Sequence, residues 1–197
     1  MLAALAAALT VGPTAHAGLI GTGSASYCDP TSSQPFAPAD TNSYTLLPGG
    51  SFESGTVPWA LSGGAKIVPG NETRYLHSRQ DSHSLYLPAG GSAVTPTTCF
   101  ALGDWHARFM LKNTGSSTGA VDVQVVVPSL VGGLLTVLDG GTVQAGGTWT
   151  PSPRVELLVS NLTSLVGTEA VAFRFTAVGR GAAYQLDDVY LDPWKRF

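Results

Sequence analysis

The sequence is poor in charged residues. Only 12% of its 197 residues are Asp, Glu, Lys or Arg, and the formal net charge is −3. The ten Lys and Arg residues are scattered along the chain, so there is no basic stripe for phosphate contacts. The sequence therefore predicts a protein with no nucleic-acid partner.

Long apolar runs are missing after the N-terminus. The run Leu2 to Val11, the Gly12-Pro13 break and the small-x-small tripeptide at residues 15–17 are typical of a signal peptide, which we expect at residues 1–17. The alternative, a buried helix, fits less well because Gly and Ser dominate the residues that follow. No later stretch is long enough to span a bilayer. We therefore expect a secreted, extracellular protein with no membrane span.

Cysteine is limited to Cys28 and Cys99. In an oxidising extracellular environment two cysteines most simply form one structural disulfide, which would tie the N-terminal segment to the folded domain. On the chain-entropy model, closing a loop of this length contributes about 4 kcal/mol. The alternative, a catalytic thiol, has less support because neither cysteine lies in a motif that lowers its pKa.

Short apolar or alternating runs recur along most of the chain and are separated by Gly- or Pro-containing turns such as Gly140-Gly141. This spacing is typical of an all-β sandwich or barrel. We expect a flexible leader at residues 18–42 and one β-sandwich domain at residues 43–197. The predicted strands are Tyr44–Leu47, Trp59–Leu61, Ala65–Val68, Arg74–His77, Ser84–Leu87, Ala93–Phe100, Trp105–Lys112, Ala120–Val127, Leu134–Leu138, Thr142–Ala145, Arg154–Ser160, Ala170–Val178 and Ala182–Leu191.

Alternation predicts which side chains face the core, because successive residues of a strand point to opposite faces. The predicted inward residues are Trp105, Ala107, Phe109, Leu111, Val121, Val123, Val125, Val127, Val155, Leu157, Val159, Val171, Phe173 and Phe175. If the opposite faces belong to one curved sheet, they form a hydrogen-bonding surface that contains Arg108, Gln124, Arg154, Glu156 and Arg174. The alternative is an ordinary solvated face.

Two segments near the ends of the predicted domain carry the most specific signals. Residues 48–55 read Pro-Gly-Gly-Ser-Phe-Glu-Ser-Gly and are followed by Trp59, and residues 184–191 read Tyr-Gln-Leu-Asp-Asp-Val-Tyr-Leu. Together they resemble the carbohydrate-binding modules of families four and nine and the wider galactose-binding-like jelly rolls. Those open with Gly-Phe-Glu-x-Gly and Trp, and close with an apolar-Asp-Asp-Val strand. The resemblance implies a jelly roll whose first and last strands can lie side by side.

The resemblance also implies a structural Ca²⁺ ion, which the family often holds between those two strands. Glu53 matches the opening ligand, Asp187 or Asp188 the closing one, and Asp81 is a third candidate carboxylate. Carboxylates and carbonyls are the ligands that Ca²⁺ prefers. The alternative is that these acids cap turns or meet Arg side chains.

Sugar binding in the family relies on aromatic rings and on polar side chains. Tyr75 and Trp149, which lie beside turns, are the aromatic candidates for a ligand site, and Arg108, Gln124 and Arg174 are the polar candidates. Single aromatics in strands are more often part of the core.

Three patterns suggest enzymes, and each has a simpler interpretation. Residues 115–119 match Gly-x-Ser-x-Gly, but a nucleophile elbow needs a helix after the turn and a downstream His, so we predict a hairpin loop. His77, Asp81 and His83 match no zinc spacing, which favours a hydrogen-bonding role. A glycosidase needs two carboxyls at a defined separation, and a sequence does not show that distance.

Three functions are therefore ranked. The first is a secreted, non-catalytic binding module whose ligand is a polysaccharide or oligosaccharide. The second is a structural or protein-interaction scaffold of the cell envelope, and the third is a hydrolase.

Overall fold

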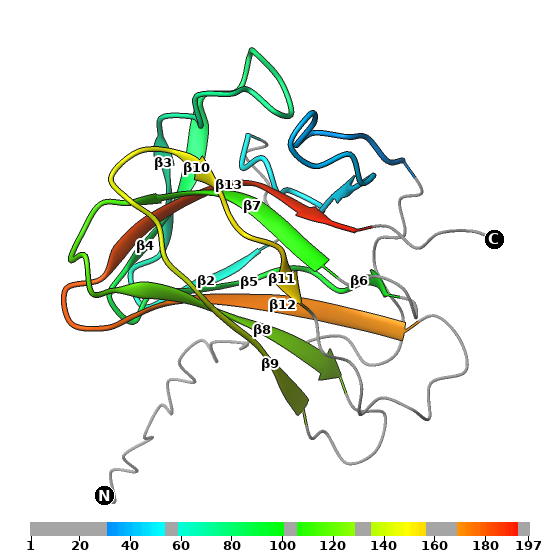
Figure 1. The fold of residues 1–197 in the computed structure, drawn as a ribbon. Coiled ribbons are helices and arrows are strands. Elements are labelled where there is room, and N and C mark those ends of the chain that lie inside the picture. Colours follow the sequence, from blue (N-terminus) through cyan, green and yellow to red (C-terminus); the bar gives the residue numbers. More distant parts are fainter. Residues whose placement is uncertain (1–30, 54–58, 101–105, 129–134, 157–168, 193–197) are drawn as a thin grey trace, which may run out of the picture.

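The computed structural model describes residues 31–53, 59–100, 106–128, 135–156 and 169–192. These residues form thirteen β-strands, and no α-helix occurs among them (Figure 1). No helix in this part of the chain has the length and apolar character that crossing a membrane requires. The strands lie in two antiparallel sheets, which pack face to face.

The first sheet has seven strands in the order β10-β7-β13-β4-β3, with β1 added beside β13 and β11 beside β7. All its pairings are antiparallel. Its strands are β1 (Thr45–Leu46), β3 (Lys66–Pro69), β4 (His83–Pro88), β7 (His106–Asn113), β10 (Thr150–Pro151), β11 (Val155–Glu156) and β13 (Ala183–Leu191).

The second sheet has six strands in the order β2-β5-β12-β8-β9, with β6 added beside β12. These pairings are also antiparallel. Its strands are β2 (Ala60–Ser62), β5 (Ser92–Val94), β6 (Thr98–Phe100), β8 (Ala120–Pro128), β9 (Leu135–Val143) and β12 (Glu169–Val178).

The chain passes repeatedly from one sheet to the other, as in a jelly roll. It leaves the first sheet after β4, returns for β7, and leaves again for β8 and β9. The first and last strands lie side by side, with Thr45 opposite Leu191 and Leu46 opposite Tyr190. The structure thus confirms the all-β sandwich, its jelly-roll class and the predicted neighbourhood of the two ends.

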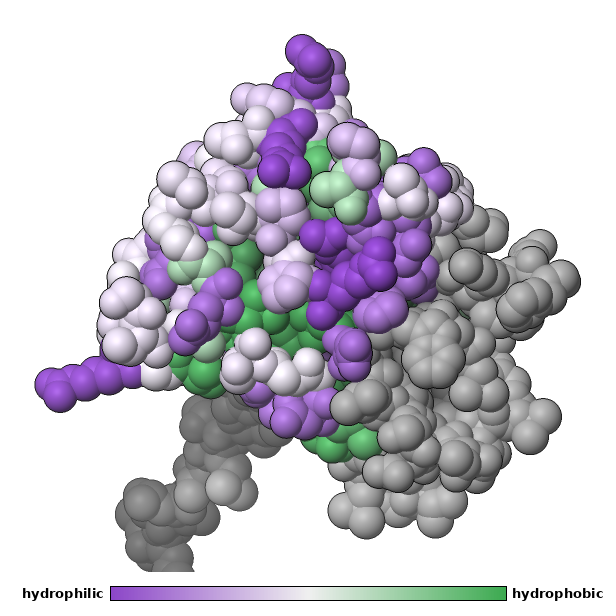
Figure 2. Space-filling view, in the orientation of Figure 1, coloured by the Kyte–Doolittle hydropathy of each residue, from purple (hydrophilic) through white to green (hydrophobic). Residues whose placement is uncertain are grey.

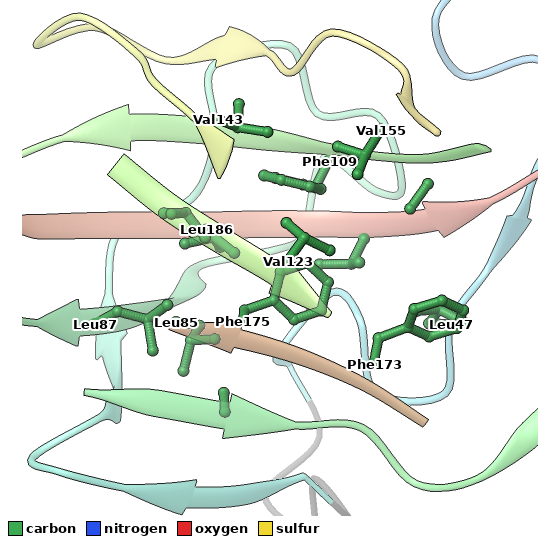
Figure 3. Packing of buried hydrophobic residues seen from close by; sticks show 14 of the residues in the cluster. Leu47, Leu85, Leu87, Phe109, Val123, Val143, Val155, Phe173, Phe175 and Leu186 are labelled. Atoms are coloured by element: carbon green, nitrogen blue, oxygen red, sulfur yellow. The ribbon is translucent and has the colours of Figure 1, made fainter. Parts of the chain in front are cut away.

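The core lies between the two sheets and follows the predicted alternation (Figure 3). Leu85, Leu87 and Leu186 of the first sheet meet Val123 and Phe175 of the second. Every predicted inward residue that the structure describes is buried in this cluster: Ala107, Phe109, Leu111, Val121, Val123, Val125, Val127, Val155, Val171, Phe173 and Phe175. The other three, Trp105, Leu157 and Val159, lie outside the described residues.

Two local expectations were wrong. Residues 74–77 form a loop and not a strand. Gly140-Gly141 was expected to end a strand, but β9 runs through it, with a register shift opposite Val123. Gly141 has a φ of 90°, which only Gly adopts easily, so the pair accommodates a bulge in a continuous strand.

A second, smaller apolar cluster lies on the outer face of the first sheet. Phe36, Tyr44, Met110 and Tyr190 are buried there, and Trp149 packs against them. Residues 31–42, expected to belong to a flexible leader, thus include a packed anchor: Phe36 is 2% exposed. In Figure 1 this segment (blue) lies above β13. Figure 2 shows apolar atoms in the middle of the same view, between the levels of the two sheets. The first sheet is therefore covered on both faces over part of its area.

Candidate functional site

A β-bulge in β13 turns two adjacent aspartates away from the core. Leu186 and Val189 both point inward although they are three residues apart, whereas strict alternation would place them on opposite faces. The register to β7 shifts between Asp187 and Tyr190, and Asp188 has a φ of 47°, so the strand holds one extra residue. Asp187 and Asp188 therefore both avoid the core, and both are fully buried.

The loop between β3 and β4 supplies the groups that face these aspartates. The backbone N–H of Glu72 donates to Asp187 Oδ2 (2.9 Å), and the backbone N–H of His77 donates to Asp188 Oδ2 (3.1 Å). Asp81 Oδ2 lies 2.7 Å from His77 Nδ1, as expected for a hydrogen-bonding role of this histidine. The loop thus brings Asp81 beside Asp188: one ligand atom from each of His77, Asp81 and Asp188 lies within 4.8 Å of the other two.

Glu72 organises the same loop from inside. It is fully buried, and its carboxylate accepts hydrogen bonds from the backbone N–H groups of Arg74 and Leu76. Sequence reasoning missed Glu72, because nothing in the tripeptide Asn71-Glu72-Thr73 shows that its carboxylate is buried. We call Glu72, Asp81, Asp187 and Asp188 the acidic cluster.

The acidic cluster brings carboxyl groups together in a buried place, where the charged form is disfavoured. Burial, reinforced by the neighbouring Asp188, raises the pKa of Asp187 to about 9. Burial and the nearby Glu72 raise the pKa of Asp188 to about 7. Among the described residues no Lys or Arg forms an ion pair with the cluster. Asp188 Oδ1 is buried and has no hydrogen-bond partner among the residues that the structure describes. These oxygens are the donors that a hard divalent cation requires.

Glu53 takes no part in this cluster, although the resemblance implied it as a ligand. Its Oε1 accepts hydrogen bonds from the backbone N–H groups of Ser82 (2.7 Å) and His83 (2.6 Å), and its Oε2 contacts their side chains. Burial alone would raise the pKa of Glu53, but these hydrogen bonds outweigh it and lower the pKa. Glu53 therefore fixes the end of the loop that carries Asp81.

The predicted surface of Arg108, Gln124 and Arg174 does not exist as one face. Arg108 lies in the first sheet, whereas Gln124 and Arg174 lie in the second, so the outer faces that carry them point away from each other. The prediction required knowing which strands share a sheet, and alternation within a strand does not give that information.

Arg108 is engaged instead with the N-terminal anchor. Its Nη1 donates to Asp40 Oδ2 (2.6 Å), and its guanidinium lies 4.3 Å from the centre of the Phe36 ring. Arg154 donates to both oxygens of Asp40 (2.7 and 3.1 Å), and the Tyr44 hydroxyl donates to Oδ2 (2.7 Å). We call Asp40, Tyr44, Arg108 and Arg154 the arginine clamp. The side chain of Arg108 is therefore held by the anchor on the first sheet, away from Gln124 and Arg174.

Gln124 and Arg174 belong to a polar patch on the outer face of the second sheet. They are directly opposite each other on β8 and β12, and Arg174 Nη1 donates to Gln124 Oε1 (3.3 Å). Asp139 lies opposite Gln124 on β9. The polar patch consists of Asp122, Gln124, Asp139, Arg174 and Thr176, all at least partly exposed.

Charge in the polar patch is mixed. Burial raises the pKa of Asp122, Asp139 adds to this effect, and Arg174 opposes it. The patch thus offers carboxylate acceptors, an amide and a guanidinium within a few strand positions. Such planar groups can donate and accept several hydrogen bonds in fixed directions.

The two aromatic candidates lie apart from the polar patch. Tyr75 is 48% exposed, in the loop between β3 and β4. Trp149 is half-buried against the second apolar cluster, on the first sheet. Neither ring joins Gln124 and Arg174 in one site.

Two further predictions concern the ends of strands. Gly115–Gly119 joins β7 to β8 without a helix, so it is no nucleophile elbow; because β7 and β8 belong to different sheets, it is not a hairpin either. Cys99 lies in β6, but Cys28 lies outside the described residues, and their disulfide stays a prediction.

No protein-family model and no curated protein sequence matches the chain. The family 61 module TmCBM61, solved in complex with β-1,4-galactotriose, is 19% identical, with a TM-score of 0.47 over 77% of this chain and 98% of its own. The CBM22-1 xylan-binding domain of Xyn10C from Paenibacillus barcinonensis is 17% identical, with a TM-score of 0.47 over 75% of this chain and 93% of its own.

A third similar structure is the family 11 module of the cellulase Lic26A-Cel5E from Clostridium thermocellum. It is 11% identical, with a TM-score of 0.42 over 78% of this chain and 96% of its own. These similar structures are all carbohydrate-binding modules. At such identities and TM-scores, the similarity assigns the chain to no family.

Proposed function

We propose that the protein is a non-catalytic, extracellular carbohydrate-binding module, related to families four and nine, and that it binds its ligand on the polar patch of the second sheet. The observation that carries this proposal is the cross-strand set of Gln124, Arg174 and Asp139. Sugar hydroxyls both donate and accept hydrogen bonds, and this set presents donors and acceptors side by side on a rigid sheet.

The sheet itself supports recognition by pre-organisation. Gln124 and Arg174 alternate with core residues such as Val123, Val125 and Phe173, so their backbone positions are fixed by the packing of the sandwich. The hydrogen bond between the two side chains holds the guanidinium in place before a ligand arrives. A ligand therefore orders few side chains when it binds, which favours affinity.

Binding to xylan and to β-1,4-galactan tests the proposal, by affinity gel electrophoresis and then calorimetry. We expect the full chain to bind a polysaccharide, and Arg174→Ala to weaken its association constant about tenfold, the effect of losing one or two hydrogen bonds. Arg180→Ala is the matched control, because Arg180 is exposed in the turn between β12 and β13.

Failure of the protein to bind any glycan in a broad panel would refute the proposal. That result would favour the second candidate, a protein-interaction scaffold of the cell envelope. If the protein binds a glycan but Arg174→Ala and Arg180→Ala lower the association constant equally, the ligand binds elsewhere on the molecule.

We further propose that the acidic cluster holds a structural Ca²⁺ ion. The support is the buried, unpartnered Asp188 Oδ1 together with Asp81, whose side chain is 6% exposed. A divalent cation would give Asp188 Oδ1 a partner and would favour the ionised form of the carboxyls that burial otherwise disfavours. Asp81 and Asp188 would hold the ion, with Asp187 and Glu72 shaping the loop around it.

Thermal unfolding with Ca²⁺ and with EGTA tests this second proposal. A ligand that binds only the folded state at a hundred times its dissociation constant stabilises it by about 2.7 kcal/mol. We expect Ca²⁺ to raise the melting temperature of the wild type but not of Asp188→Asn. A wild-type melting temperature that is the same in Ca²⁺ and EGTA would refute the ion.

A further inference from the structure

Part of the outer face of the first sheet stays uncovered, and a row of side chains crosses it. Core packing of Ile67, Leu85, Leu87, Leu111, Tyr184 and Leu186 forces the residues between them to point outward. Register aligns these outward residues: Lys66 is opposite Tyr86, Tyr86 is opposite Gln185, and Gln185 is opposite Lys112. Figure 1 shows the strands concerned in the upper layer of the sandwich.

Trp149 extends the row by one position. It precedes Thr150, which pairs with Leu111, and the Lys112 ammonium lies 5.9 Å from the centre of its ring. We call Lys66, Tyr86, Gln185, Lys112 and Trp149 the cationic aromatic row. It contains two of the three lysines of the whole chain.

The row is more exposed than its neighbours on the same face. One outward position further along each strand, Met110, Asp187 and Ser84 are fully buried. Lys112, Gln185 and Tyr86 are half-buried, and Lys66 is exposed. The row therefore borders the covered part of the sheet and remains accessible.

The chemistry of the row repeats at its two ends. The Lys66 ammonium lies 5.9 Å from the centre of the Tyr86 ring, as the Lys112 ammonium does from that of Trp149. Each pair joins an apolar ring face to a positive charge, and Gln185 lies between the pairs. Among the described residues no carboxylate forms an ion pair with either lysine.

We propose that the cationic aromatic row binds an acidic polysaccharide, one whose sugars carry carboxylates, with its chain running across the strands. A ring can pack on the apolar face of a sugar while the neighbouring ammonium pairs with the carboxylate of that sugar. Neighbouring strands are about 4.8 Å apart, so the two pairs, three intervals from each other, are about 14 Å apart. One oligosaccharide of several residues can contact both pairs, with Gln185 bonding hydroxyls between them.

This site is independent of the polar patch, because the two lie on the outer faces of different sheets. Its ligand differs as well: the polar patch contains two carboxylates, which disfavour an anionic glycan, whereas the row contains none. The two sites can therefore be tested separately on the full chain.

Calorimetry with tetragalacturonate as the probe tests the row. We expect binding that weakens between about 0.01 M and about 0.15 M salt, because the lysines are screened over a Debye length. The double variant Lys66→Gln/Lys112→Gln should lose about tenfold in association constant. Its melting temperature and its binding of neutral xylan should be unchanged. Arg180→Gln is the charge-matched control and should bind tetragalacturonate like the wild type.

Three results would overturn the proposal. The first is no binding of tetragalacturonate at the lower salt concentration. The second is unchanged binding in the double lysine variant, or an equal loss in Arg180→Gln. The third is wild-type affinity in a folded Trp149→Ala variant, which would leave only attraction of opposite charges. Arg174→Ala separates the two proposals, since it should weaken the neutral glycan and leave tetragalacturonate binding intact.

Discussion

The arginine clamp makes the substitution Asp40→Asn a sensitive test of how the N-terminal anchor contributes to stability. The Asp40 side chain is 4% exposed and accepts hydrogen bonds from Tyr44, Arg108 and Arg154, besides the backbone N–H of Asn42. Asn has the same shape but no charge, and its amide places a donor where the carboxylate had an acceptor. The substitution therefore leaves Arg108, whose side chain is 13% exposed, without its counter-charge.

The size of the effect follows from burial. Removing one partner of a buried ion pair costs roughly 3–5 kcal/mol, because the other charge stays desolvated. Arg108 keeps two hydrogen bonds to the carbonyl of Ser152, and Arg154 is 45% exposed and can turn to water, which places the expected loss near the lower limit. We expect Asp40→Asn to lower the free energy of unfolding by about 3 kcal/mol, or the melting temperature by about 6–12 °C.

Urea unfolding followed by tryptophan fluorescence measures this change, and an unchanged m-value would show that it is a change of stability alone. Asp139→Asn is the matched control: Asp139 is exposed, and Asn can still accept the hydrogen bond from the backbone of Gly141, so a change within about 0.5 kcal/mol is expected. A loss below about 1 kcal/mol in Asp40→Asn would refute the reasoning, because it would mean that the clamp is solvated.

Three further predictions concern pH, the loop and the disulfide. Hydrogen bonds from Arg154 and from the other members of the arginine clamp hold the pKa of Asp40 well below its ordinary value, so its contribution is complete above about pH 4 and is lost as the pH falls. The stability difference between wild type and Asp40→Asn should therefore shrink between about pH 4 and about pH 2; a constant difference would contradict the pKa. Glu53 accepts hydrogen bonds from the backbone N–H groups of Ser82 and His83, so Glu53→Gln should lower the free energy of unfolding in urea by about 1–2 kcal/mol and speed hydrogen exchange at these two amides. Unchanged exchange would contradict this role of Glu53. The double variant Cys28→Ser/Cys99→Ser should have a free energy of unfolding lower by up to about 4 kcal/mol. A melting temperature equal to that of the wild type would contradict the predicted disulfide.

The core could be predicted from the sequence because alternation is a local property of a strand. Phe109, Val123 and Phe173 face inward for the same reason that their neighbours face outward. Met110 shows the limit of this reasoning: it does point away from the core, but it is buried because Phe36 and Tyr44 cover it. What covers an outer face depends on distant segments, and no local pattern records it.

The candidate sites were only partly predictable for the same reason. Asp81, the third candidate carboxylate, lies close to Asp188, but Glu53 binds the loop, and Glu72 is the buried acid that sequence reasoning missed. Gln124 and Arg174 face each other because β8 and β12 pair, whereas Arg108 belongs to the other sheet. Contacts between segments that are distant in the sequence decided each of these outcomes.

The pairing of β1 with β13 also has a mechanical meaning. Because the two strands are antiparallel, the chain enters at Thr45 and leaves at Leu191 at the same end of the ladder. Within this ladder, a pull on its two ends therefore opens the Thr45–Leu191 pair first and the Leu46–Tyr190 pair next, so that the hydrogen bonds break one after another and do not share the load. On the N-terminal side, the pull is resisted before it reaches β1 by the Ser33–Tyr44 pair and by the bonds from Arg108 and Arg154 to Asp40. The salt bridges of the anchor and the Ser33–Tyr44 pair thus have to break before a pull from the N-terminal side loads the β1–β13 ladder.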